Sequence, residues 1–336
     1  MENEQDIQAV AKTISREGPA APGARMFGWG MLGVLAAFLI NNVLNIGYGV
    51  PGLSALFAGG AGASAYFTLL VYAAAIAIGI VYVTRTPGQS LRWDADKIHR
   101  FNVCFIRGCF WAVLFVGVVD AVIALMRIEN LLGTFFGASM VTDLGRVQFV
   151  GPYIHIPLVI LGFVVALFTR TLGFTWLALL IVTAELGIVI SRFVFSYEQA
   201  LMADLVRYWY AALFLFASAY TLYDEGHVRV DVLYASFGRT RKGFFNSIGT
   251  IALGMTTCWV ILAIGFAGKQ SIINSPVMNF EITQSGTTGL FVKYQMAAFL
   301  GIFAISMLIQ FVSYFFESIA DYRDEPGHRE VVAVSH

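Results

Sequence analysis

Eight apolar stretches, each long enough to cross a lipid bilayer, constrain the fold of this chain more than any other feature. The hydrocarbon core of a bilayer is about 30 Å thick and a helix rises about 1.5 Å per residue, so a span needs about 20 apolar residues. No period-two pattern typical of a membrane β-barrel recurs. The sequence therefore predicts an all-α, polytopic membrane helical bundle with about eight transmembrane helices. The stretches cover residues 26–47, 62–84, 102–126, 152–169, 172–194, 205–223, 243–268 and 290–320.

Composition agrees with a membrane protein and excludes several partners. Of the 336 residues, 58% are hydrophobic and 12% are charged, whereas soluble domains carry about 25% charged residues. Lys plus Arg and Asp plus Glu are balanced at 21 each, so there is no basic field to attract nucleic acid. Cys104, Cys109 and Cys258 lie in apolar runs without a CxxC pair and are expected to be buried, small apolar residues.

The distribution of basic residues predicts the topology. Lys and Arg are concentrated in the loops at 85–100 and 229–242 and in the chain ends, whereas the loop between the first two spans carries no charge. Because cytoplasmic loops are enriched in Lys and Arg, eight spans with both termini in the cytoplasm fit this pattern. The first 25 residues are too polar and too long to resemble the short leading region of a secretory signal, so we expect the first span to be retained.

The sequence contains no motif that indicates a catalytic activity. Residues 28–33, GWGMLG, match the GxGxxG pattern, but they open a membrane span and follow no strand, so helix packing through small residues is favoured over dinucleotide binding. The sequence contains no HExxH, GxSxG or P-loop motif, and no cluster of metal-binding residue types. We therefore expect neither an enzyme nor a cofactor.

Two acidic residues lie inside the apolar stretches. Glu185 is near the middle of the fifth stretch, and Asp120 is nearer the outer end of the third. Ionisable groups in hydrocarbon are costly and often functional. Each is interpreted either as an ion or proton site or as a hydrogen-bonded group that packs against another helix, and the packing interpretation is favoured.

A compact, mixed-charge strip, EGHVRVDVLY, separates two apolar stretches at residues 225–234. It holds Glu225, His227, Arg229 and Asp231, and the positive-inside pattern places it on the cytoplasmic side. The stretch before the sixth span, residues 197–208, has the pattern of an amphipathic helix at the membrane interface.

These segments carry a family resemblance. The motifs SRFVF (191–195), the acidic entry helix from Glu198 to Arg207 and EGHVRVD (225–231) follow one another in an order and spacing that resemble the small membrane subunit, DctQ type, of tripartite ATP-independent periplasmic (TRAP) transporters. The resemblance covers residues 172–322. The usual small subunit has four membrane helices, so the first half of this chain is additional.

The resemblance implies a scaffold subunit in a sodium-coupled system that takes up an organic acid across a bacterial inner membrane. Its implied partners are a large membrane subunit of the DctM type, which holds the sodium and substrate sites, a periplasmic binding protein, and the membrane lipids. Arg192, in the SRFVF motif, and the charged strip at 225–231 are the expected positions for contact with a partner or for structural polar bonds. The implied domains are a tail (1–25), a four-helix extension (26–169), a DctQ-like domain (170–322) and a second tail (323–336).

Two alternatives remain open. One is a self-sufficient ion-coupled secondary transporter that uses Glu185 or Asp120 as its coupling acid, although no internal repeat supports it. The other is a redox anchor that binds quinone or haem. His155 is the histidine nearest to a membrane span, whereas haem sites in bundles typically use histidines on facing helices.

Overall fold

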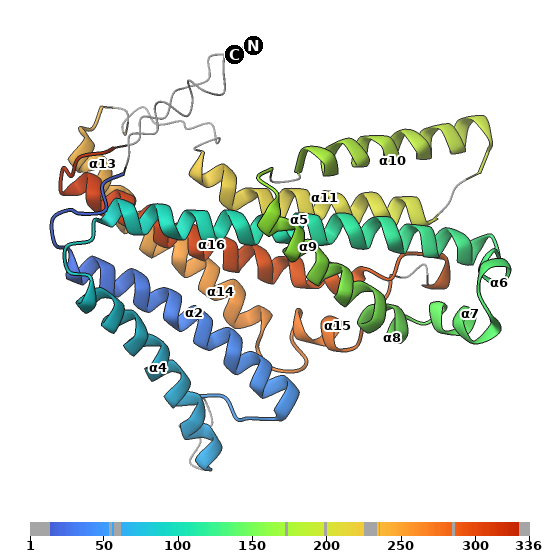
Figure 1. The fold of residues 1–336 in the computed structure, drawn as a ribbon, viewed down its shortest axis with the longest axis horizontal. Helices are drawn as coiled ribbons and strands as arrows, with labels where there is room; N and C mark the ends of the chain where they lie inside the picture. The colour runs from blue at the N-terminus through green and yellow to red at the C-terminus, as the bar shows by residue number, and fades with distance from the viewer. Residues whose placement is uncertain are drawn as a thin grey trace. The chain divides into compact units, whose positions relative to one another are not determined.

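The computed structural model describes residues 14–53, 56, 62–171, 174–197, 200–224, 234, 236–283 and 286–328. Apart from one isolated β-bridge between Glu17 and Gln89, the regular elements within these ranges are helices (Figure 1). They are α2 (Pro22–Tyr48), α4 (Ala63–Arg85), α5 (Leu91–Ile128), α6 (Leu132–Phe135), α7 (Ala138–Leu144), α8 (Val147–Val150), the π-helix η1 (Gly151–His155), α9 (Ile156–Phe168), α10 (Phe174–Val194), α11 (Ala200–Tyr223), α13 (Arg239–Gly249), the π-helix η2 (Thr250–Met255), α14 (Thr256–Gly265), α15 (Asn274–Met278), the 3-10 helix η3 (Gly286–Thr288) and α16 (Lys293–Tyr322).

The described residues contain eight helices that are long and apolar enough to cross a membrane, which confirms the predicted helical class. Two of these helices are composite: α8, η1 and α9 run on without a break, as do α13, η2 and α14. In the first, Pro157 has no N–H group to donate to a carbonyl of the preceding turn. The backbone widens there, and the Ile156 N–H donates to the Gly151 carbonyl five residues earlier, as in a π-helix.

The chain divides into two compact units. The first comprises residues 1–100, 221–260 and 307–336, and so contains α2, α4, the start of α5, α13, η2, the start of α14 and the end of α16. Within it α2 and α4 lie side by side (Figure 1). A Cβ atom on Gly33 would lie 2.7 Å from the Ala75 carbonyl oxygen, and one on Gly28 would lie 2.4 Å from the Phe316 ring. Two glycines of the GWGMLG motif thus permit close helix packing, as predicted.

The second unit comprises residues 101–220 and 261–306. It contains the rest of α5, the helices α6 to α11, the end of α14, α15, η3 and the start of α16. A Cβ atom on Gly162 of α9 would clash with the Ala112 backbone of α5 at 2.4 Å, and one on Gly117 would clash with Trp209 of α11. Glycine therefore lets α5 approach both α9 and α11 closely.

Two sequence predictions about local structure have an outcome here. Cys109 and Cys258 are buried, as expected, whereas Cys104 is only partly buried; all three are free cysteines. The entry helix predicted at 197–208 is found from Ala200 onward as the first part of α11, which continues to Tyr223, and the Asp204 side chain in it is buried. Its carboxylate faces protein donors rather than lipid headgroups, as described below.

Candidate functional site

The first turn of α5 places Asp94 at the centre of a buried polar cluster in the first unit. Its Oδ2 atom accepts hydrogen bonds from Arg25 Nε at 2.7 Å and from Trp29 Nε1 at 3.1 Å. Its Oδ1 atom accepts from Gln89 Nε2 at 2.6 Å and from the Tyr82 hydroxyl at 3.3 Å. The Arg25 and Asp94 side chains are 1% and 0% exposed. Neither charge is hydrated, so each depends on the other and on the surrounding donors.

Arg25 extends this cluster to the C-terminal end of α4. Its guanidinium donates to the Thr86 carbonyl and, at 2.8 Å, to the Thr86 hydroxyl. The Lys97 ammonium lies 5.0 Å from the Tyr82 ring centroid, within the range of a cation–π contact. The position of Asp94 at the N-terminus of α5 also favours its negative charge through the helix dipole. The cluster therefore joins α2, α4 and α5.

Arg92, on the same turn of α5, organises a second polar cluster at the end of α16. Its guanidinium donates to Asp321 Oδ1 at 2.8 Å and to the carboxylate of Glu317. It also donates to the backbone carbonyls of Pro326, at 2.8 Å, and Glu325, at 3.0 Å. This one side chain thereby fixes both the last turns of α16 and the segment that follows.

Replacement of Arg92 by lysine should loosen that segment, because an ammonium group keeps the charge but lacks the planar fork of donors. We expect the free energy of unfolding to fall by about 1–3 kcal/mol, and cleavage after Arg323 by trypsin, in the segment that follows α16, to accelerate. Mass spectrometry of the digested protein in detergent measures the cleavage. The control is Arg100→Lys, since the exposed Arg100 pairs with Asp96 at the surface. Equal cleavage rates in the two variants would contradict the assignment.

Glu325 follows α16 and is itself buried. Burial raises the pKa of its carboxyl above the usual value, while the charges of Arg323 and Arg92 lower it. Arg323 Nε lies 3.2 Å from Glu325 Oε1. Burial is the larger effect, so the pKa of this carboxyl is raised overall, and the two arginines offset only part of the rise.

In the second unit, two buried aspartates hold the loop that precedes α16. Asp204 accepts hydrogen bonds from the Leu290 N–H at 3.2 Å and from the Thr283 hydroxyl at 3.0 Å. Asp120 accepts from the next amide, the Phe291 N–H, at 2.6 Å. Both carboxylates lie just before the N-terminus of α16, where the helix dipole favours negative charge. Their burial is therefore offset by backbone donors as well as by nearby charge.

Arg127, at the end of α5, contacts the same loop before α16. Its guanidinium lies 4.0 Å from the centroid of the Phe291 ring and donates to the Gly289 carbonyl at 2.7 Å. Because Asp120 is also on α5, this helix contacts both the amide and the carbonyl side of the loop. The loop is thus held by α5 from both sides, in addition to the bonds that it makes with Asp204 of α11.

Asp120 begins a chain of polar contacts through the interior of this unit. Its Oδ1 atom lies 3.4 Å from His155 Nε2, and both side chains are fully buried. His155 Nδ1 lies 2.9 Å from the Tyr294 hydroxyl, which accepts a hydrogen bond from Gln295 Nε2 at 3.0 Å. The Tyr208 hydroxyl donates to Gln295 Oε1. If the Tyr294 hydroxyl donates to His155 Nδ1, the proton on Nε2 faces Asp120.

This chain joins four helical elements: α5, η1, α16 and α11. Chemically it can hold these elements together through polar contacts, or pass a proton between its ionisable members. Nothing in the sequence next to Asp120 indicated a basic partner, because His155 lies in a different helix. The pairing becomes apparent only in the folded chain.

Glu185 lies in a different environment, on the exposed surface of α10. In the apolar part of α10 only 11% of the residues are buried, whereas 50% are buried in the apolar part of α16. Arg192 follows seven residues later and therefore lies on the same side of the helix; it is also exposed. Since Asp120 is buried and Glu185 is on the surface, the two intramembrane acids do not form one site.

The remaining site residues predicted from the sequence, Glu225, His227, Arg229 and Asp231, lie outside the described residues. Among the residues that the structure does describe, no group of three or more His, Cys, Asp and Glu side chains is arranged to hold a metal ion. Sequence reasoning missed Arg25, Asp94 and Arg92 as structural centres. The available signal was the presence of charged residues immediately before a long apolar stretch.

These observations define a polytopic membrane protein in which buried ionisable groups join helices to one another. Within it, residues 178–321 match the family described as tripartite ATP-independent periplasmic transporters, DctQ component. This region, from α10 to the end of α16, is therefore a DctQ-type domain, as the sequence resemblance indicated, and such a domain is a component of a TRAP transporter. The long apolar helices α2, α4, α5 and α9 precede it. No curated protein and no solved structure matches the chain.

Proposed function

We propose that this protein is the scaffold subunit of a TRAP transporter that takes up an organic acid with sodium across a bacterial inner membrane. It would pair with a large membrane subunit of the DctM type, and a periplasmic binding protein would deliver the substrate. The match over residues 178–321 carries the proposal, because the DctQ component is one part of a tripartite system. Both chain termini would lie in the cytoplasm, as the distribution of Lys and Arg indicates.

The environments of the buried acids support a scaffold role. The carboxylates of Asp94, Asp120 and Asp204 accept hydrogen bonds from protein groups. Such bonds fix helices and loops in place, whereas a transport site must release its ligand. Rigid polar contacts of this kind are what a static partner of a moving subunit requires.

The exposed surface of α10 supports contact with the large subunit. Lipid tails can cover the apolar residues on this helix, such as Val182 and Phe193, but they cannot solvate a carboxylate. The Glu185 carboxyl is therefore expected to contact a membrane helix of the large subunit that offers a hydrogen-bond donor. Arg192 would contact the same subunit near the end of α10. The charged strip at residues 225–231 is proposed as a further contact, on the cytoplasmic side.

Co-purification tests this proposal. The tagged chain would be expressed together with the candidate large membrane subunit and solubilised in a mild detergent, and the stoichiometry of the eluted complex would be measured. We expect a stable complex in which both subunits are needed for sodium-driven uptake after reconstitution. Recovery of the tagged chain alone, with uptake activity of its own, would refute the scaffold role and favour the self-sufficient transporter.

Glu185→Leu should weaken the complex by about 3- to 30-fold, since hydrogen bonds between membrane helices contribute about 0.6–2 kcal/mol. Glu185→Gln retains hydrogen bonding and should change uptake less than severalfold. Affinity between the purified subunits is measured in detergent or nanodiscs. Thr183→Val is the matched control, because the exposed Thr183 hydroxyl donates within its own helix to the Leu179 carbonyl. Complete loss of uptake in Glu185→Gln, with assembly intact, would instead identify a coupling acid.

A further inference from the structure

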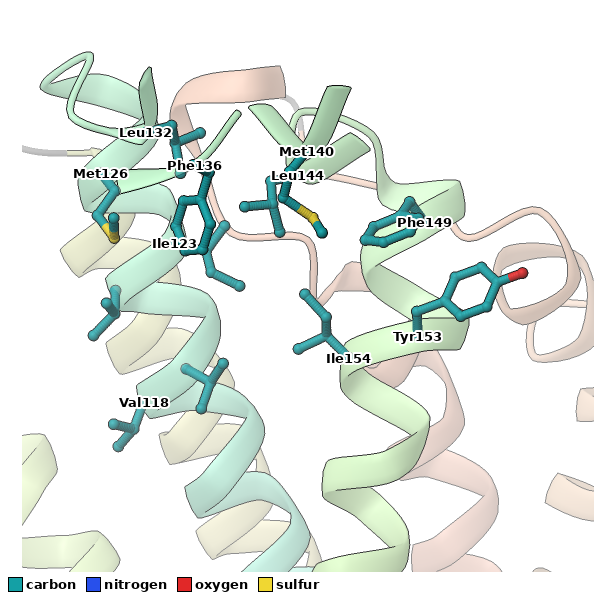
Figure 2. Close-up of a pocket in the computed structure, with 12 residues that line it drawn as sticks. Val118, Ile123, Met126, Leu132, Phe136, Met140, Leu144, Phe149, Tyr153 and Ile154 are labelled. Atoms are coloured by element: carbon teal, nitrogen blue, oxygen red, sulfur yellow. The ribbon is translucent and has the colours of Figure 1, made fainter. Parts of the chain in front are cut away.

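An apolar cavity of about 470 Å³ lies in the second unit, between α5 and the composite helix that contains η1 (Figure 2). Val118, Ile123 and Met126 line it from α5, and Ile154 lines it from η1. Short segments around α6 and α7 close one end, where Met140 and Leu144 are found in the lining. Figure 2 shows that the Tyr153 hydroxyl, the only side-chain oxygen among the lining residues, points away from the space.

Ordered water is a poor occupant of this cavity. A buried water molecule needs two to four polar partners, and apolar cavities of about 150 Å³ have been found to stay dry and to bind hydrocarbons. A cavity with a wholly apolar wall and several times that volume is within the usual range for a ligand site. Its chemistry fits a hydrocarbon chain.

The mouth of the cavity continues into the outer surface of the same helices. Val118 and Val122 line the cavity and are also 42% and 51% exposed. In α9, which follows the lining residues Tyr153 and Ile154 in the chain, Ile156 and Ile160 are exposed as well. Because α5 and α9 belong to helices long and apolar enough to span a membrane, the surface around the mouth would face lipid tails. An acyl chain can therefore enter directly from the bilayer.

The segment that lines one end of the cavity carries a positively charged residue. Arg146 is exposed and lies in the sequence between two lining residues, Leu144 and Phe149. Phe135 and Tyr153, close by in the chain, are strongly exposed aromatic residues, which are enriched where a membrane protein meets the headgroup region. The arrangement matches a lipid whose tail is apolar and whose headgroup is anionic.

We propose that this cavity binds one acyl chain of an anionic phospholipid, with the lipid phosphate at Arg146. The lining residues all precede the DctQ-type domain, so the site belongs to the additional N-terminal part of the chain. The inference does not depend on the transport role, because it rests on the cavity, its mouth and its charged rim alone.

The test uses the full-length protein in nanodiscs that contain phosphatidylglycerol with a photoreactive diazirine near the end of one acyl chain. After illumination, mass spectrometry maps the labelled peptides. We expect labelling of the segment 118–154, which Ile123→Trp and Met140→Trp should abolish by filling the cavity. Leu179→Trp, on the exposed surface of α10, should leave this labelling unchanged. Labelling spread evenly over all exposed helices, and insensitive to the two cavity variants, would overturn the proposal.

The headgroup is tested separately. Arg146→Gln should weaken labelling by phosphatidylglycerol about fivefold and labelling by phosphatidylcholine little, because a basic residue near the surface favours anionic lipid. Equal labelling by the two lipids in the wild-type protein would overturn the phosphate contact. Should a tryptophan variant fail to fold, excess unlabelled phosphatidylglycerol must compete with the probe in the wild-type protein. Failure to compete, or recovery of a quinone or a protein helix from the cavity, would refute the acyl-chain assignment.

Discussion

Asp94→Leu should lower the free energy of unfolding of the full-length protein by about 3–5 kcal/mol, since it removes one partner of a buried ion pair and leaves the other charge uncompensated. Arg25, 2.7 Å away, is 1% exposed and would keep its charge in an environment without water. The donors on Trp29 and Gln89 would also lose their acceptor. Unfolding in detergent, followed by tryptophan fluorescence and by size-exclusion chromatography, measures the loss.

The double variant Arg25→Leu/Asp94→Leu should recover much of this stability. Replacement of a complete buried ion pair by apolar residues is often neutral or stabilising, whereas loss of one partner is costly. Asp96→Asn is the matched control, two residues along the same helix, where the carboxylate pairs with the exposed Arg100. That change should cost no more than about 1 kcal/mol. Similar losses in Asp94→Leu and Asp96→Asn would show that burial of the Arg25 pair does not determine the effect.

The helical class of this protein can be predicted from the sequence because few backbone structures are stable in the hydrocarbon core of a membrane. A backbone without access to water must satisfy its own hydrogen bonds, so long apolar stretches become helices. The prediction was least accurate where charged residues continue a helix. α5 begins at Leu91 and not at residue 102, since the charged residues of its first turns are satisfied by Arg25, Glu317 and other protein groups. Hydropathy detects the apolar part of a helix only.

The polar clusters could not be derived from the sequence for a related reason. In the sequence Arg25 belongs to a basic N-terminal tail and Asp94 to a basic loop, because only the local neighbours of each residue are visible there. Their pairing depends on how α2 and α5 are placed in the fold, and the close contacts of Gly28 with α16 and of Gly33 with α4 fix the position of α2. Residue type indicated that a buried acid needs a partner, but only the fold identifies the partner.

Glu185 and Asp120 illustrate the limit of reading intramembrane acids from position alone. Both interrupt apolar runs, and the sequence suggested the same two interpretations for each. In the structure Asp120 is enclosed by the Phe291 amide and His155, whereas Glu185 is exposed on α10. The first environment favours an internal structural or proton-exchanging role, and the second favours contact with a partner.

The domain division at residues 169 and 170 stays a prediction. Each compact unit combines helices from both sides of that division. Asp120 and Arg127, from the additional N-terminal part, hold the loop before α16 in the DctQ-type domain. The additional helices thus supply bonds to the domain that follows them, and do not merely precede it in the chain.

Asp120→Leu should therefore destabilise the folded protein by about 3–5 kcal/mol, as expected when one member of a buried polar pair is removed. The Phe291 N–H would lose its acceptor, and His155 would face an apolar side chain. Asp120→Asn should cost much less, because an amide oxygen can still accept from the Phe291 N–H. Thermal unfolding in detergent measures both effects, and Asp143→Leu, at a partly exposed position on α7, serves as the control with an expected change within about 0.5 kcal/mol.

The same two variants separate the structural interpretation of Asp120 from the coupling-acid alternative. If Asp120 holds the loop before α16, Asp120→Asn should retain both assembly with the large subunit and ion-driven uptake, while Asp120→Leu loses both. A coupling acid must ionise and release its proton or cation in each cycle, which an amide cannot do. If Asp120→Asn assembles normally and is stable but has lost uptake, the structural interpretation is wrong. The chain of contacts from Asp120 through His155 to Tyr294 would then be assigned to ion or proton coupling.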